Sequence, residues 1–160
     1  MKTRNHIIVN LMIEASKNVL IKRIEDWLAK KHPKKTIDFR LGSGKSTYHK
    51  KLTHNKHEIT YGVKMVENKL SSMRSCSRWT TGKEIINRNY YNGEVTIQHA
   101  LAHTVVHECA HFIQVLGEHR DYGSVHNAKF YEILDRMHSS GAADEVLEYL
   151  NRYETFRNLE

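Results

Sequence analysis

The chain has 160 residues, of which 39% are hydrophobic, and this length suits one domain with a sizeable core. No run approaches the roughly 18 apolar residues of a membrane-spanning helix, and two cysteines do not make a disulfide framework. These properties exclude a membrane protein and a disulfide-rich secreted domain. We expect a cytoplasmic protein, nucleoid-associated or nuclear if it acts on DNA.

Charge is distributed unevenly along the chain. Residues 1–80 contain 18 Lys and Arg against 6 Asp and Glu, whereas residues 81–160 contain 7 against 12. The net charge of +7 therefore combines a basic half of +12 with an acidic half of −5. A basic surface of this kind is typical of proteins that bind nucleic acid, and a solvated lysine-rich surface is the alternative interpretation.

The basic half begins with a predicted helix. Residues 14–31 show helical spacing of apolar side chains, with Ser16 as a candidate N-cap and Pro33 after the end. The apolar residues 7–13 either extend this helix or form a separate turn. Residues 35–41 alternate between apolar and polar side chains, which predicts a strand.

A basic segment follows that strand. Its LGSGKST sequence lacks the spacing of a phosphate-binding loop, because Phe39 stands where the first glycine of GxxxxGK[ST] is required. We expect a flexible loop that contacts nucleic-acid phosphates, with a tyrosine able to stack on a base. The candidate residues are Lys45, Tyr48, Lys50 and Lys51.

The next segments are predicted to complete a small sheet. Residues 57–66 alternate as a strand, a second strand is expected near residues 76–80, and a third over residues 84–90 after a turn at Thr81-Gly82. Arg74, Arg78 and Trp79 are further candidates for nucleic-acid contact. The alternative is a surface arginine pair beside a core tryptophan.

Residues 98–116 form the most informative stretch, a predicted helix with Thr96 as its N-cap. It contains His107 and His111 in an HExxH sequence, and residues four apart lie on one face of a helix. The two imidazoles can therefore bind one zinc ion, with Glu108 as general base toward a water molecule. A structural, histidine-rich helix is the alternative, since His99 and His103 continue the same spacing.

A hydrolytic zinc site usually has three protein ligands, so a third is needed. Gln114 stands where the metzincin pattern requires glycine. The remaining candidates are His126, Glu132 and His119. His126 is favoured because residues 117–124 turn the chain back before a second amphipathic segment begins there.

Two further helices are predicted after the loop. Residues 126–138 place apolar side chains on one face, and residues 142–156 do the same. The order of one helix, several strands and then helices indicates an α+β fold in a single domain over residues 1–160.

Residues 74–138 resemble the SprT-like (Spartan-type) zinc metalloprotease domain family. The resemblance rests on Ile86-Asn87, on TVVHECAHFIQ, and on VHNAKFYEIL, where a histidine opens a helix that carries an aromatic residue (His126 and Phe130). Members often carry a zinc ribbon after the protease core. This chain has only Cys76 and Cys109 and no CxxC, so we expect no ribbon.

The resemblance implies a zincin-like fold, in which a small mixed sheet packs on the HExxH helix. It implies one Zn²⁺ per chain held by His107, His111 and His126, with Glu108 as the base of a metalloendopeptidase. The implied substrates are proteins bound or crosslinked to DNA. A non-catalytic nucleic-acid-binding module with structural zinc, or with none, is the alternative. The strand form of the nucleic acid and the oligomeric state stay open.

Overall fold

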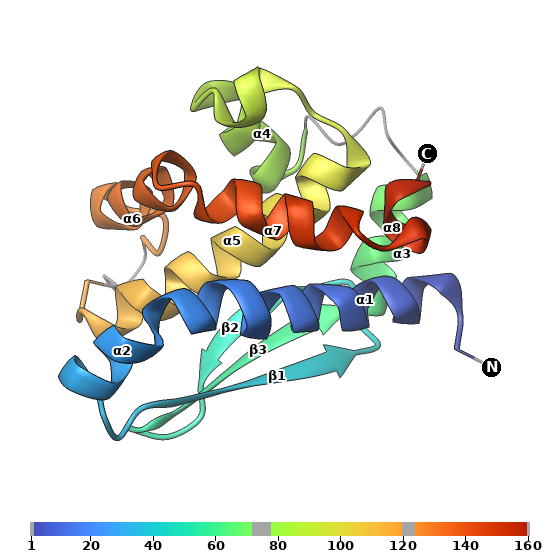
Figure 1. Cartoon of the computed structure of the whole chain (residues 1–160). Helices are drawn as coiled ribbons and strands as arrows, with labels where there is room; N and C mark the ends of the chain where they lie inside the picture. The colour runs from blue at the N-terminus through green and yellow to red at the C-terminus, as the bar shows by residue number, and fades with distance from the viewer. Residues whose placement is uncertain (1, 72–77, 120–123, 160) are drawn as a thin grey trace.

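A long helical rod crosses one face of a small sheet in the computed structural model, which describes residues 2–71, 78–119 and 124–159 (Figure 1). The rod consists of α1 (Arg4–Ala15), a π-helical segment η1 (Ser16–Ile21) and α2 (Lys22–Lys31). The apolar residues 7–13 therefore extend the predicted helix. The prediction that Ser16 is an N-cap is wrong. Ser16 is buried within the rod and donates a hydrogen bond to the carbonyl of Met12.

The sheet has three strands in the order β1-β3-β2, and its strands are β1 (Thr36–Gly42), β2 (Tyr48–Lys51) and β3 (Lys56–Gly62). β1 runs parallel to β3, and β2 runs antiparallel to it, so the predicted mixed sheet is confirmed. The inward face carries Ile37, Phe39 and Leu41 from β1, which pack against the core under the helical rod.

The other helices build the body above the sheet. They are α3 (Val63–Ser71), α4 (Thr80–Asn87), a 3-10 turn η3 (Tyr90–Gly93), α5 (Ile97–Leu116), α6 (Ala128–Ser139), α7 (Ala142–Asn151) and α8 (Glu154–Arg157). Helix α5 lies at the centre, in contact with α1, α4, α6, α7 and the edge strand β2 (Figure 1). The described residues thus form one α+β domain. None of the described helices is long and apolar enough to span a membrane.

Helix α5 begins where the sequence predicts. The Thr96 hydroxyl accepts a hydrogen bond from the backbone N–H of His99 at 3.0 Å, which satisfies one of the N–H groups that a helix start leaves unpaired. Helix α6 begins two residues later than predicted, with Asn127 as its N-cap. His126 therefore lies just before the helix. The predicted final helix is interrupted after Asn151 and resumes as α8.

The strand predicted over residues 57–66 is confirmed as far as Gly62, whereas other predictions about this region are wrong. Residues 43–55, expected to be a loop, contain the edge strand β2, and the strand predicted over residues 57–66 ends at Gly62, where α3 begins. The strand predicted over residues 84–90 is instead α4, a 3-10 turn and the left-handed residue Asn89 between them. Thr81 and Gly82, the predicted turn, are also inside α4. The strand predicted near residues 76–80 lies partly outside the described residues, and its last residue, Thr80, begins α4.

Candidate metal centre

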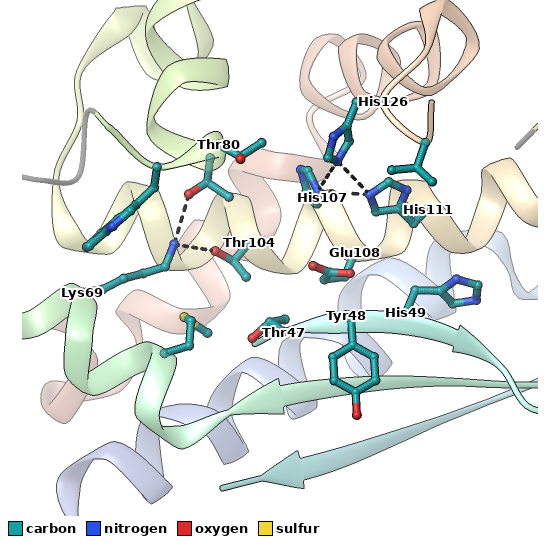
Figure 2. A pocket seen from close by; sticks show the side chains of 14 residues that line it. Thr47, Tyr48, His49, Lys69, Thr80, Thr104, His107, Glu108, His111 and His126 are labelled. Atoms are coloured by element: carbon teal, nitrogen blue, oxygen red, sulfur yellow. Dashed lines mark hydrogen bonds between the residues drawn. The ribbon is translucent and has the colours of Figure 1, made fainter. Parts of the chain in front are cut away.

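The HExxH residues lie in the wall of a cavity of about 340 Å³ between α5, β2, α3 and α4. His107, Glu108 and His111 are each at most 7% exposed, because α5 is surrounded by other elements. Figure 2 shows their side chains turned toward the cavity, with His126 approaching from the segment before α6. The fold thus brings all three histidines that the resemblance implies to one point.

The three imidazoles meet through their Nε2 atoms. Nε2 of His111 lies 3.1 Å from that of His107 and 3.2 Å from that of His126, and the third side of the triangle measures 3.2 Å. Imidazole nitrogens bind zinc at about 2.0–2.1 Å, so three of them on a tetrahedral ion lie about 3.3–3.4 Å apart. The observed triangle fits a zinc ion with a fourth, open position.

His107 is oriented by a carboxylate from a different helix. Its Nδ1 lies 3.1 Å from Oε2 and 2.8 Å from Oε1 of Glu84, which is 4% exposed on α4. Burial raises the pKa of Glu84, but the hydrogen bonds from His103 and His107 outweigh burial and hold that pKa at about 2. Glu84 is therefore a carboxylate that only accepts hydrogen bonds, so Nδ1 of His107 is the donor. A neutral His107 then has its lone pair on Nε2, which faces the centre.

His111 is oriented by Gln114. The amide nitrogen of Gln114 donates to the carbonyl of Val125 at 2.8 Å and to Oδ1 of Asn127 at 3.2 Å, which leaves the amide oxygen facing Nδ1 of His111 at 3.1 Å. His111 must therefore donate from Nδ1 and present the Nε2 lone pair to the centre. The same glutamine holds the segment that carries His126. In the sequence, Gln114 stands out only as a departure from the metzincin pattern.

Phe130 supports the three rings from α6. Its ring centroid lies 5.0 Å from that of His107, 4.3 Å from His111 and 5.1 Å from His126. The side chain is fully buried. An apolar wall behind the ligands restricts their rotamers and leaves the cavity side for a fourth ligand.

Glu108 faces the same cavity from α5, beside the edge strand β2. The backbone N–H of His49 in β2 donates a hydrogen bond to its carboxylate. Burial nevertheless raises the pKa of Glu108 above its usual range, more than the nearby His107 lowers it. A carboxyl group with a raised pKa beside an open ligand position is suited to accepting and returning a proton.

Lys69 is a cavity residue that sequence reasoning missed. It is 7% exposed on α3, and its ammonium group donates to the hydroxyl of Thr81 at 3.0 Å. It also donates to the hydroxyl of Thr104 at 3.3 Å (Figure 2). The same group lies 4.8 Å from the ring centroid of Trp79. A single lysine in a basic half of the sequence gives no sign that it is buried. Only the fold shows that Lys69 of α3 contacts α5 at Thr104, one helical turn before Glu108.

The structure separates the candidates for the third ligand. Among the described residues, the ligand atoms of His107, His111 and His126 form one group in which all atoms lie within 4.8 Å of one another. The carboxylate of Glu132 instead pairs with Lys129 and Arg136 on the exposed face of α6. His119 is an exposed residue whose backbone carbonyl, at 2.8 Å, accepts a hydrogen bond from Asn127.

The two other histidines of the α5 series have different surroundings. The ring of His99 stacks on Tyr91 with centroids 4.5 Å apart. His103 is fully buried and lies 3.2 Å from Oε2 of Glu84, so it forms a second group of possible metal ligands with Glu84 and His107.

The candidates for nucleic-acid contact fall on two sides of the cavity. Lys45, Tyr48, Lys50 and Lys51 are exposed on β2 and the loop before it, and Tyr48 also lines the cavity. Trp79 lines it from the start of α4, and Arg78 is exposed beside it. Arg74 lies outside the described residues. The loop before β2 is anchored, since Thr47 accepts a hydrogen bond from the backbone N–H of Gly62.

Comparison with known proteins gives no relative: no family model, no curated protein and no solved structure matches this chain. The site therefore rests on its own geometry. That geometry consists of three converging imidazoles, two polar groups that fix their orientation, and a buried carboxylate beside them.

Proposed function

We propose that this protein is a zinc-dependent endopeptidase of the SprT-like type, acting on proteins that are bound or crosslinked to DNA. The observation that carries the proposal is the Nε2 triangle of His107, His111 and His126, with sides of 3.1–3.2 Å, on the wall of a cavity that also contains Glu108. Three neutral imidazoles and one open position are the donor set of catalytic rather than structural zinc sites.

When bound, zinc would polarise the scissile carbonyl and make water a stronger acid. Glu108 takes the proton from the attacking water and returns it to the leaving amine. Its burial and raised pKa suit both transfers, because the carboxyl group gains and loses a proton within one reaction cycle. Glu84 and Gln114 keep the ligand rings in place throughout.

The edge strand β2 supplies a binding surface for the substrate. β2 pairs with β3 along one edge, and Thr47, Tyr48 and His49 reach the cavity from it or from the residue before it. An extended peptide that adds to the β2 edge would run past Glu108 and the histidines, which is a common mode of peptide recognition.

The DNA part of the proposal depends on charge and aromatic residues at the mouth of this cavity. Lys50 and Lys51 are exposed on β2, and the aromatic rings of Tyr48 and Trp79 line the cavity. Lysines that contact phosphates and aromatic rings that stack on bases are the usual elements of single-strand binding. A DNA-bound protein would thereby be held next to the site of cleavage.

The first experiment measures zinc by elemental analysis of untagged, dialysed protein. We expect about one zinc per chain, lost in His107→Ala and His126→Ala and retained in Glu108→Gln. The second follows cleavage of a DNA-binding protein with and without DNA. We expect cleavage that DNA accelerates and that Glu108→Gln lowers by about 10²–10⁴-fold.

Each unexpected result has a distinct meaning. Zinc without proteolysis, together with DNA affinity that survives Glu108→Gln, would establish the non-catalytic binding module instead. Proteolysis that DNA does not accelerate would keep the peptidase and remove the DNA-bound substrate. Absence of stoichiometric zinc from zinc-replete protein would overturn the metal centre itself.

A further inference from the structure

Behind the metal centre lies a series of buried and half-buried polar side chains, of which His103 and His138 have no part in the proposed peptidase chemistry. It runs from the ligand His107 to Glu84 on α4, to His103 on α5 and to His138 near the end of α6. The side chains of His103 and Glu84 are 0% and 4% exposed. Buried polar groups cost free energy unless their hydrogen bonds are satisfied, so their arrangement requires an explanation.

The proton positions along this series follow from its geometry. Oε2 of Glu84 is the acceptor for both Nδ1 of His107 at 3.1 Å and Nε2 of His103 at 3.2 Å. A carboxylate cannot donate, so each of these nitrogens carries a hydrogen. A neutral His103 with its hydrogen on Nε2 has a lone pair on Nδ1. That lone pair lies 3.0 Å from Nε2 of His138, which must therefore donate.

His138, at the outer end of this series of side chains, is also held in place by its neighbours. Tyr90 stacks on His138 with ring centroids 3.6 Å apart and an angle of 2° between the planes. The hydroxyl of Tyr90 donates to Asp135, which is also paired with Arg88. Tyr90 belongs to a turn in which non-glycine residues on either side have positive φ, at 56° for Asn89 and 49° for Tyr91. Such strain persists only where the surrounding structure enforces it.

We infer that Glu84, His103 and His138 form a positioning relay that fixes the tautomer and orientation of the zinc ligand His107. The N–H groups of His103 and His107 both donate to the carboxylate of Glu84. The negative charge of Glu84 therefore lies next to His107 and makes this imidazole a stronger zinc ligand. The relay connects His107 to side chains of α4, α5 and α6, and it ends at a surface hollow lined by His138 and Asp135. This inference rests on the proposed zinc site.

The same residues have an alternative role as a second metal site, formed by Glu84, His103 and His107. That role needs a lone pair on Nδ1 of His107 while Nε2 of the same ring faces the first ion. A neutral imidazole has only one such lone pair. The relay accounts for both nitrogens of His107 without a second ion.

The test compares Glu84→Gln, which keeps the shape of the side chain and removes its charge, with Glu132→Gln, which removes a carboxylate from the exposed face of α6. Zinc affinity is measured by competition with a chromophoric chelator. We expect Glu84→Gln to weaken zinc binding by about 10–100-fold and Glu132→Gln to leave it within about twofold.

His138→Leu, at the half-buried outer end, tests the relay if Glu84→Gln does not fold. We expect it to weaken zinc binding more than His138→Gln does, because glutamine retains a donor.

A spectroscopic measurement provides a readout that a merely structural role would not move. Long-range ¹H–¹⁵N spectra of the zinc-loaded protein should place the ring hydrogen of His107 on Nδ1 and that of His103 on Nε2. Wild-type zinc affinity in Glu84→Gln, or the hydrogen of His103 on Nδ1, would overturn the relay and leave the peptidase standing. Two zinc ions per chain would replace the relay by the second metal site. A wild-type protein that binds no zinc would overturn both proposals.

Discussion

Replacing Gln114 with alanine should separate the support of the metal centre from the general stability of α5. Gln114 is fully buried, accepts a hydrogen bond from His111 and donates to Val125 and Asn127. Each such bond contributes about 0.5–1.5 kcal/mol, so Gln114→Ala should lower the free energy of unfolding by about 2–4 kcal/mol without zinc. It should also weaken zinc binding by about 10–100-fold, because His111 loses the acceptor that orients it.

Gln98 is a matched control on the same helix. Its amide nitrogen donates to the carbonyls of Leu159 at 2.7 Å and Arg157 at 3.3 Å, at the opposite end of α5 from His111. Gln98→Ala should therefore cost about 1–2 kcal/mol of stability and leave zinc affinity unchanged. The comparison removes the objection that any amide lost from α5 disturbs the metal centre.

The assay is urea unfolding with chelator and with zinc at a hundred times the wild-type dissociation constant. At that concentration zinc should stabilise the wild-type protein and Gln98→Ala by about 2.7 kcal/mol. With affinity weakened 10–100-fold, the same zinc should stabilise Gln114→Ala by only about 0.4–1.4 kcal/mol. Equal stabilisation of all three proteins would refute the conclusion that Gln114 orients His111.

Three further predictions follow from other parts of the molecule. Burial lowers the pKa of His57 to about 4, so the unfolded chain binds a proton that the folded chain does not between about pH 6.5 and 4. The free energy of unfolding should therefore fall as pH drops through that window, and it should fall by less in His57→Asn. If the urea midpoints of the wild-type protein and of His57→Asn decrease by the same amount between pH 7 and pH 4.5, this prediction is wrong. Lys50→Ala and Lys51→Ala should each reduce the salt dependence of DNA binding by about one unit of slope, measured by titration at several salt concentrations, and an unchanged slope would exclude phosphate contact. Tyr61→Phe removes the buried hydroxyl 2.7 Å from Ser16 and should lower the thermal midpoint by an amount equivalent to about 1 kcal/mol, whereas an unchanged midpoint would mean that this bond adds nothing.

Local patterns sufficed to predict the central helix and the convergence of its two histidines. The apolar residues of α5 and the Thr96 cap depend on neighbours in sequence, and a four-residue spacing puts His107 and His111 on one face whatever surrounds them. The strand predicted over residues 84–90 is wrong because Ile85, Ile86 and Tyr90 fit a strand as well as a short helix. In the structure the buried residues of α4 follow helical spacing, at Thr81, Gly82, Glu84 and Ile85, and Ile86 is 46% exposed.

Non-local partners explain what sequence reasoning missed. Glu84 reaches His107 across 23 positions of the chain, and no local pattern marks a single glutamate as a partner of a distant histidine. β2 is polar because it is an edge strand in which His49 is the one buried residue, so it lacks the alternation that identifies strands. A polar residue among the apolar residues 112–116 is the available signal for Gln114.

The position of Phe130 has a consequence for the kinetics of metal exchange. Its ring packs against all three histidines from the side of α6 and is fully buried, and the opposite side of the histidines faces the cavity in which we propose that the peptide binds. In that proposal the metal and the substrate enter through the same cavity. A peptide or inhibitor bound in the cavity should slow the extraction of zinc by a chelator, in proportion to its occupancy. Chelator resistance therefore becomes a way to detect ligands of this protein before any substrate is known.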